Sequence, residues 1–491
     1  MENNLDYLKQ ERSQEWRSEL RKKIKNKERL EIPRVKMPEV DPNERIKSNI
    51  EVNVGLSVEQ AIIEAQRCLD CPNPTCISGC PVNINIPKFI KHIESNEINQ
   101  AAAVLKETSA LPAVCGRVCP QEKQCEEKCF YTQKLQKDPV AIGHLERFAA
   151  DFERNSGEMS IPKVLQPNGI KIAAIGSGPA SLAFAGDMAK LGYDITVFEA
   201  LHEIGGVLKY GIPEFRLPNE IVDVEVSNLE KMGVKFRTNF IVGRTQSFDD
   251  LKEQGFKAFF VASGAGLPRF MNIPGENLIG IQSSNEYLTR VNLMNAADPE
   301  YDTPVLSGKN VAIIGGGNTA MDSVRTAKRL GADRAMIIYR RSETEMPARV
   351  EEIKHAKEEG IEFMNLTNPI EYFGDENGRV KGMRVVKMEL GEPDSSGRRR
   401  PVVIEGSETD IPVDTVVVSV GVSPNPLIPQ CLQELNVSKW GTIEVDQDKM
   451  QSSIPELFAG GDIVRGGATV ILAMGDGRKA AENMHKYLQE K

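Results

Sequence analysis

The chain has 491 residues, a formal net charge of −9 at pH 7 and nine cysteines. Its length predicts about three domains, and its acidic balance argues against a protein that binds nucleic acid or a membrane surface. Because no run of 18 apolar residues occurs, we expect no membrane span, and the first residues lack the basic and apolar regions of a secretory signal. These features predict a soluble, cytoplasmic protein of several domains.

Residues 1–50 are rich in lysine and arginine, with a basic run over residues 21–29. Apolar residues at positions 16, 20 and 24 recur at helical spacing, which predicts a surface helix followed by a proline-punctuated linker. We interpret the basic run as a solvated face rather than a docking site. A Ser-Val-Glu-Gln capping box at 57–60 then opens a helix that leads into Cys68.

Eight of the nine cysteines lie in two quartets, each of which contains a Cys-Pro pair: Cys68, Cys71, Cys76 and Cys80, then Cys115, Cys119, Cys125 and Cys129. Such clustering, without an export signal, indicates metal ligation rather than disulfides. The spacing is typical of [4Fe–4S] ligation in ferredoxins; a pair of structural zinc sites and unligated thiols are the alternatives. Around the quartets we expect helices starting at Pro87, over 98–108 and over 139–152.

The stretch from 171 to 199 predicts one βαβ unit that binds a dinucleotide. Gly176 allows the tight turn, and Gly178 lets the backbone approach a pyrophosphate at the start of the helix. Ser181 stands where a third glycine is usual, which weakens the match. Glu199 ends the second strand, where an acid binds a ribose hydroxyl.

Two later stretches favour a flavin in this first unit. The diglycine at 205–206 follows the ribose acid closely, as a bulky ring system requires, although an ordinary glycine loop is the alternative. A strand over 457–461 ends in Asp462, which can hold the ribityl chain of FAD, and a helix opens near Thr469. Because these residues lie at the far end of the chain, the first nucleotide domain must be split, with another domain inserted in it.

A second fingerprint runs from residue 310 to 341. Gly315 and Gly317 form the turn, and the following strand ends in Arg340 and Arg341 instead of an acid. Guanidinium groups at this place match a ribose 2′-phosphate, which favours NADP; plain surface charges are the alternative. A strand over 414–421 ends in small residues and closes the region.

These motifs in this order resemble the glutamate synthase small-subunit family. That family includes the large subunit of the bifurcating NADH-dependent ferredoxin:NADP oxidoreductase and the N-terminal half of dihydropyrimidine dehydrogenase. The resemblance covers roughly residues 55 to 485. It rests on Cys-Pro-Asn-Pro-Thr-Cys at 71–76, Cys-Gly-Arg-Val-Cys-Pro at 115–120, Gly-Ile-Pro-Glu-Phe-Arg-Leu-Pro at 211–218, Tyr-Arg-Arg at 339–341 and Ala-Gly-Gly-Asp at 459–462.

The motifs and the resemblance together predict an α/β protein with two Rossmann-like dinucleotide-binding domains behind an all-α iron–sulfur domain. The expected parts are a charged extension (1–50), a helical domain with two [4Fe–4S] clusters (51–160), an FAD domain (161–300 and 424–491) and an inserted NADP domain (301–423). The resemblance implies that NADPH delivers hydride to FAD. The flavin splits the electron pair, and the clusters pass single electrons to a partner subunit.

The resemblance also implies the ligand sets. One cluster would take Cys68, Cys71, Cys76 and Cys129; the other would take Cys80, Cys119, Cys125 and Glu146, leaving Cys115 spare, unless the symmetric quartets are right. FAD would lie on Gly176, Gly178, Pro179, Ala180, Ser181, Glu199, Gly205, Gly206, Leu208, Arg216, Asp462, Thr469 and Val470. NADP would lie on Gly315, Gly317, Asn318, Thr319, Ala320, Arg340, Arg341 and Gly421.

Two partners fit this electron conduit. One is the large chain of glutamate synthase; the other is the small ferredoxin-reductase-like subunit of a flavin-bifurcating transhydrogenase. A non-catalytic iron–sulfur or zinc scaffold is disfavoured because both fingerprints and the Gly-Asp motif are complete. No acid–base or nucleophile constellation competes, since the five histidines are scattered.

Overall fold

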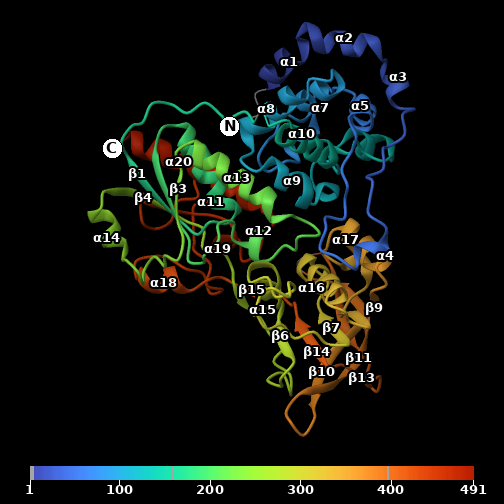
Figure 1. The fold of residues 1–491 in the computed structure, drawn as a ribbon. Helices are drawn as coiled ribbons and strands as arrows, with labels where there is room; N and C mark the ends of the chain where they lie inside the picture. Colours follow the sequence, from blue (N-terminus) through green and yellow to red (C-terminus); the bar gives the residue numbers. More distant parts are fainter. Residues whose placement is uncertain (1–4, 158, 395–396, 491) are drawn as a thin grey trace.

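A computed structural model describes residues 5–157, 159–394 and 397–490. Figure 1 shows a helical unit in blue and teal, a first sheet unit in green and red, and a second sheet unit in yellow and orange. In the described part of the chain, no helix combines the length and the apolar character needed to cross a membrane.

The helical unit packs its long helices around an apolar core that includes Phe89, Ile93, Leu105 and Leu145. Its helices are α5 (Val58–Gln66), α6 (Thr75–Ser78), α7 (Ile86–Glu94), α8 (Ile98–Thr108), α9 (Pro112–Val118) and α10 (Ile142–Ser156). The predicted capping box is confirmed, because the Ser57 side chain accepts from the Gln60 backbone. The predicted helix over 98–108 is confirmed with the same bounds.

The first three N-terminal helices lie on the helical unit, and the fourth lies against the second sheet unit, as Figure 1 shows. They are α1 (Leu5–Ser13), α2 (Glu15–Lys23), α3 (Asn26–Arg29) and α4 (Pro42–Arg45). The interpretation of the basic run as a solvated face is wrong for Arg29, which is 0% exposed and pairs with Glu94, and for Arg21, which is part-buried and pairs with the buried Asp70. Arg45 is likewise fully buried and pairs with Glu359. Their acidic partners lie far along the sequence, so charge spacing alone could not reveal them.

The first sheet is parallel, with strand order β16-β4-β1-β2-β3. Its strands are β1 (Lys171–Ile175), β2 (Asp194–Phe198), β3 (Lys235–Arg237), β4 (Phe256–Val261) and β16 (Leu457–Ala459). Helices α11 (Pro179–Lys190), α13 (Asn219–Lys231) and α20 (Val470–Gln489) cover one face; α14 (Phe248–Glu253) and α18 (Leu427–Cys431) pack on the other. Because β16 comes from the far end of the chain, the predicted split of this unit is confirmed.

The second sheet is also parallel, in the order β6-β14-β7-β8-β9. Its strands are β6 (Ile281–Ser283), β7 (Asn310–Ile314), β8 (Arg334–Tyr339), β9 (Glu362–Asn365) and β14 (Thr415–Val418). The unit starts earlier than the expected residue 301, because β6 pairs with β14. With three residues, β6 is too short to show as a periodic pattern in the sequence.

Helices cover one face of the second sheet and an antiparallel sheet covers the other. The helices are α15 (Ser284–Leu288), α16 (Asn318–Arg329) and α17 (Val350–Glu358); the strands are β10 (Thr367–Gly374), β11 (Val380–Pro393), β12 (Arg399–Val403) and β13 (Thr409–Pro412). Two short strands, β5 (Leu267–Pro268) and β15 (Val422–Ser423), pair where the chain leaves and re-enters the first unit.

Candidate functional site

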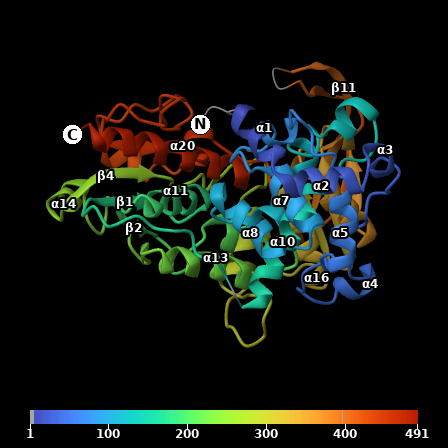
Figure 2. The ribbon, with the colours of Figure 1, turned by 90° about the horizontal axis from the view of Figure 1, so that it is seen from above.

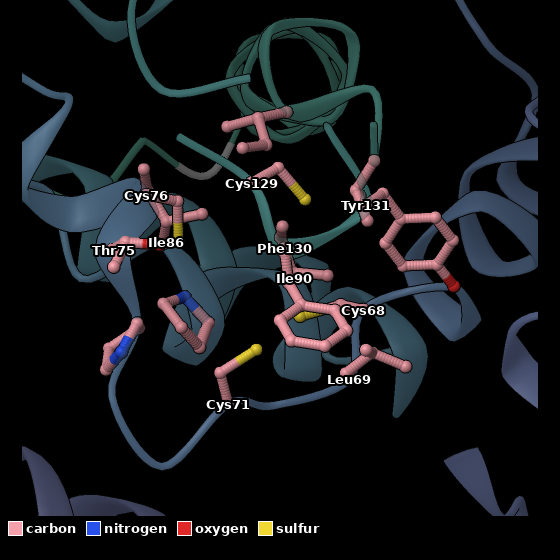
Figure 3. A pocket seen from close by; sticks show the side chains of 14 residues that line it. Cys68, Leu69, Cys71, Thr75, Cys76, Ile86, Ile90, Cys129, Phe130 and Tyr131 are labelled. Carbon is pink, nitrogen blue, oxygen red and sulfur yellow. The ribbon is translucent and has the colours of Figure 1, made fainter. Parts of the chain in front are cut away.

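A cavity in the helical unit brings together four cysteines from two separate stretches of sequence. Its walls include Cys68, Cys71, Cys76 and Cys129, with Ile86, Ile90 and Phe130 between them (Figure 3). Burial raises the pKa of the Cys71 thiol to about 12, so the free thiol is protonated at neutral pH. A bound metal centre would hold such thiols as thiolates. The residues that share the cavity are those that the resemblance implies for the first cluster.

The other thiols gather around Glu146 in α10. This carboxylate is deeply buried, and its Oε1 has no hydrogen-bond partner among the described residues. Burial, and then the charge of Glu225, raise its pKa to about 8. The same carboxylate interacts electrostatically with the thiols of Cys80, Cys119 and Cys125. An unpaired buried carboxylate is costly, and a cluster iron would supply the missing partner, so these residues fit a second cluster.

Cys115 has other contacts. Its sulfur lies 3.4 Å from the sulfur of Met474, and its thiol also interacts with the thiol of Cys119. It is fully buried. The contact with Met474 is consistent with the expectation that Cys115 is a spare thiol beside the second set.

The spacing of the sulfur atoms bears on the zinc alternative. Tetrahedral zinc, with Zn–S bonds of about 2.3 Å, holds its sulfurs about 3.8 Å apart. All nine cysteines belong to the described residues, and no three of their sulfurs lie within 4.8 Å of one another. The thiols are therefore spread more widely than a zinc site requires, which favours the larger iron–sulfur clusters.

The first glycine turn leaves open space before α11. Gly176 has φ +91°, and a Cβ there would lie 2.5 Å from the Ala262 carbonyl oxygen. At Gly178, the N-cap of α11, a Cβ would meet no atom within 4 Å. A pyrophosphate can therefore reach the helix N-terminus. Glu199 accepts hydrogen bonds from the Ser177 backbone nitrogen (2.9 Å) and hydroxyl (2.6 Å), which ties β2 to the turn.

The diglycine and the far end of the chain complete this cradle. A Cβ at Gly206 would lie 2.9 Å from the Gly178 Cα, so the diglycine sits directly on the turn. Asp462 starts α19 (Asp462–Arg465), and burial raises its pKa to about 6. Thr469 caps α20. The buried Ser181 hydroxyl has no partner among the described residues. This cradle fits the adenosine and ribityl ends of FAD.

One supporting residue of the cradle was missed in the sequence. The buried Asp476 carboxylate accepts from the Gly461 backbone nitrogen at 3.0 Å and from Arg465 at 2.6 and 2.7 Å. It therefore holds the Gly-Gly-Asp turn against α20. The signal was the glycine on each side of it, at 475 and 477, since two glycines in a helix indicate close backbone packing.

Helix α20 also extends to the helical unit, as Figure 2 shows from above. A Cβ at Gly477 would lie 2.1 Å from the Ala180 carbonyl oxygen, so α20 crosses α11 with the two backbones in contact. One turn earlier, Met474 touches Cys115. A Cβ at Gly475 would lie 3.0 Å from the carbonyl oxygen of Pro81, which follows Cys80. The helix at the FAD cradle therefore borders the second thiol set.

The second glycine turn has the same geometry but a divided arginine pair. Gly315 has φ +145°, and a Cβ there would lie 2.3 Å from the Ser419 carbonyl oxygen. Arg340 is exposed at the end of β8. Arg341 is buried instead and donates to Asp394 (2.6 Å) and to the Arg399 carbonyl (2.8 Å). Of the two, Arg340 is the one placed to meet a ligand at the strand end.

Arg216 lies between the two sheet units. Its guanidinium donates to both oxygens of Asp322 on α16, at 2.6 and 2.7 Å, and lies 3.4 Å from Glu352. The role in FAD binding that the resemblance implies for Arg216 therefore competes with an ion pair between the two sheet units. The other predicted residues lie at the two turns: Pro179, Ala180, Gly205, Leu208 and Val470 at the first, and Gly317, Asn318, Thr319, Ala320 and Gly421 at the second.

Comparison with known proteins matches both halves of the chain. The model of dihydropyrimidine dehydrogenase domain II, 4Fe-4S cluster, matches residues 45–158, and that of pyridine nucleotide-disulphide oxidoreductases matches residues 170–477. The fold of the sheet units is that of Mycobacterium tuberculosis FprA in complex with NADPH, with a TM-score of 0.56, 22% identity, and coverage of 66% of this chain and 85% of that one.

Two curated relatives are similar over most of the chain. The glutamate synthase [NADPH] small chain of Azospirillum brasilense is 37% identical over 463 residues, which cover 93% of this chain and 95% of that one. The NADP(+)-dependent formate dehydrogenase subunit beta of Moorella thermoacetica is 37% identical over 84% of this chain and 60% of that one. The chain therefore belongs to the pyridine nucleotide-disulphide oxidoreductases and, among them, to the family of glutamate synthase [NADPH] small chains.

Proposed function

We propose that this chain oxidises NADPH as the small subunit of a glutamate synthase and passes the electrons through FAD and two [4Fe–4S] clusters to a partner chain. Bound FAD would supply two-electron hydride chemistry, and iron–sulfur clusters would supply single-electron transfer. The chain's own residues bind the two nucleotides at the glycine turns and keep water from the second thiol set by burial.

The order of the sites in space carries this proposal. Helix α20 starts at the FAD cradle and touches Cys115 beside the second thiol set through Met474. The second set neighbours the first, since Cys125 interacts electrostatically with Cys76. Cys80, Cys119 and Cys125 are buried, whereas Cys71, Cys76 and Cys129 are partly exposed. Electrons would therefore leave through the first set, where Phe130 is 40% exposed.

The length of the match favours the large chain of glutamate synthase as the partner. This chain covers 95% of the Azospirillum small chain but only 60% of the formate dehydrogenase subunit. A small ferredoxin-reductase-like subunit is the competing partner. Affinity purification of the tagged chain from its own cells, under anaerobic conditions, separates the two by the size and cofactor of the protein that is retained.

The cofactor proposal is tested on anaerobically purified protein. We expect about eight iron and eight acid-labile sulfide per FAD, as two [4Fe–4S] clusters require. NADPH should first bleach the flavin absorbance and then produce the EPR signal of reduced clusters, with NADH far slower. Stoichiometric zinc with little iron, or no flavin bleaching, would overturn the proposal.

A further inference from the structure

Helices α1 and α2 direct three arginines at one residue of the first thiol loop. Asp70 lies between Cys68 and Cys71, has φ +50° and is 0% exposed. Its carboxylate binds Arg17 through Oδ1 and Arg21 through Oδ2. Arg12 donates to its backbone carbonyl at 2.6 Å. The loop that carries two of the four cysteines is thus held from outside the cysteine motif.

Independent contacts fix these helices on the helical unit. The Trp16 ring stacks on His92 of α7 at 4.3 Å. Glu11 pairs with Lys88 of the same helix at 2.9 Å. In Figure 1 the two helices lie over the unit at the top of the molecule. The arginines are therefore parts of a packed interface and not of a loose tail.

The charges at the two thiol sets differ. Arg17 and Arg21 meet the carboxylate of Asp70 and Arg12 meets its backbone carbonyl, and Arg12 is also close enough to Cys71 to act on that thiol electrostatically. At the second set the buried acid Glu146 faces the thiols, and Glu126, which pairs with Arg34, lies between the sets and acts on both Cys125 and Cys129. A cluster gains negative charge on reduction, and net charge near it sets its potential. The cations around Asp70, of which Arg17 is buried and Arg21 is part-buried, therefore favour the reduced state of the first cluster.

We propose that Arg17 and Arg21 are positioning residues of the first cluster, which hold the Cys68–Cys71 loop through Asp70 and raise the reduction potential of the cluster bound there. Their charge makes the outer cluster the better electron acceptor of the two. The proposal rests on the proposed function only in requiring that both clusters bind.

The test is an EPR-monitored redox titration of the full chain. In the Arg17→Gln/Arg21→Gln variant, the midpoint potential of one cluster should move to more negative values while that of the other stays, with iron content unchanged. Arg17→Lys/Arg21→Lys should return the potential towards that of the wild type. Lys22→Gln is the matched control, because Lys22 lies on the same helix but is exposed, with Glu19 as its partner, and should leave both potentials unchanged.

Asp70→Asn separates charge from distortion of the loop. Removing the carboxylate leaves the arginines uncompensated, so the same cluster should move to more positive values. Shifts of both variants in the same direction, an unmoved potential in the glutamine variant, or iron loss that lysine does not restore would each overturn the inference. A wild-type chain without two clusters would instead refute the proposed function.

Discussion

The sulfur of Met474 lies 3.4 Å from the sulfur of Cys115, and this contact joins the helix of the FAD cradle to the second thiol set. Cys115 is therefore oriented towards α20, although its spacing in the sequence is that of a ligand. Glu146, in contrast, is a buried carboxylate with an oxygen that no described residue satisfies. The Cys115 sulfur already has a contact partner, whereas one oxygen of Glu146 lacks a hydrogen-bond partner among the described residues.

This difference predicts the result of a ligand exchange at the second set. Cys115→Ala should keep the full iron content, whereas Cys119→Ala and Glu146→Ala should each lose about half of it, since one of two clusters is lost. Iron and acid-labile sulfide analysis of anaerobically purified variants measures this. Iron loss in Cys115→Ala together with full iron in Glu146→Ala would restore the symmetric quartets.

The sequence predicted elements with a strong local period and missed those that depend on distant partners. Both βαβ units form in the stretches where they were expected, and the helix over 98–108 has its expected bounds, because apolar periodicity and capping are local. The burial of Arg29 and Arg45 depends on Glu94 and Glu359, one of them 314 residues away. The roles of Arg340 and Arg341 could not be separated either, since only the fold shows that Asp394 binds the second.

The divided arginine pair predicts two different effects. Arg340→Gln should raise the KM for NADPH about 10- to 100-fold, because a charge-assisted bond to phosphate contributes roughly 1.5–3 kcal/mol, and should leave the KM for NADH nearly unchanged. Arg341→Gln should mainly lower the thermal midpoint, since Asp394 and the Arg399 carbonyl lose their donor. Steady-state kinetics with both nucleotides, beside thermal melts, test this; equal loss with NADH would contradict it.

Close packing of α20 on α11 predicts a graded response to added methyl groups. At Gly477 a Cβ would lie 2.1 Å from a backbone oxygen of Ala180, so Gly477→Ala must shift one helix and should cost at least about 1–3 kcal/mol. Gly475→Ala meets the Pro81 oxygen at 3.0 Å and should cost less. Thermal midpoints and the FAD content after gel filtration rank the two variants. An equal loss of stability in both variants would show that the contact between Gly477 and Ala180 is not the closest contact of α20.

Glu225 predicts a pH-dependent change of stability. It is buried in α13, where its Oε1 accepts from the Ala113 backbone nitrogen at 3.0 Å, and burial raises its pKa to about 7. An exposed glutamate titrates near about 4.3. The folded chain therefore holds this proton more tightly than the unfolded chain, and the free energy of unfolding falls as the pH rises from about 4.5 to 7.

Replacing Glu225 with glutamine removes this cost. The free energy of unfolding of Glu225→Gln, relative to that of the wild type, should rise by up to about 3 kcal/mol from pH 5 to pH 8, at about 1.4 kcal/mol per pKa unit. Thermal midpoints at both pH values give the difference. Glu230→Gln, exposed on the same helix, is the control and should show no such gain. A Glu225→Gln difference that is the same at both pH values would show that burial does not shift the proton.

The proposed exit of electrons through the first cluster predicts the effect of removing one of its cysteine ligands. Cys71 is a partly exposed cysteine of the first cavity, so Cys71→Ser should lose about half of the iron but keep FAD and the second cluster. NADPH should then reduce the flavin at the wild-type rate in anaerobic stopped-flow, because neither glycine turn is touched. Reduction of cytochrome c, a protein too large to reach the buried second set, should fall sharply.

Cys431→Ser is the matched control for this substitution. Cys431 lies 3.5 Å from the Gly243 carbonyl oxygen at the far side of the first sheet. The variant should therefore change neither iron content nor electron transfer. The two measurements divide the possible failures. Full iron in Cys71→Ser would show that Cys71 is not a ligand. Half the iron with unchanged cytochrome c reduction would show that electrons leave from the flavin or the second cluster, and the partner would then have to dock on the sheet units and not at Phe130.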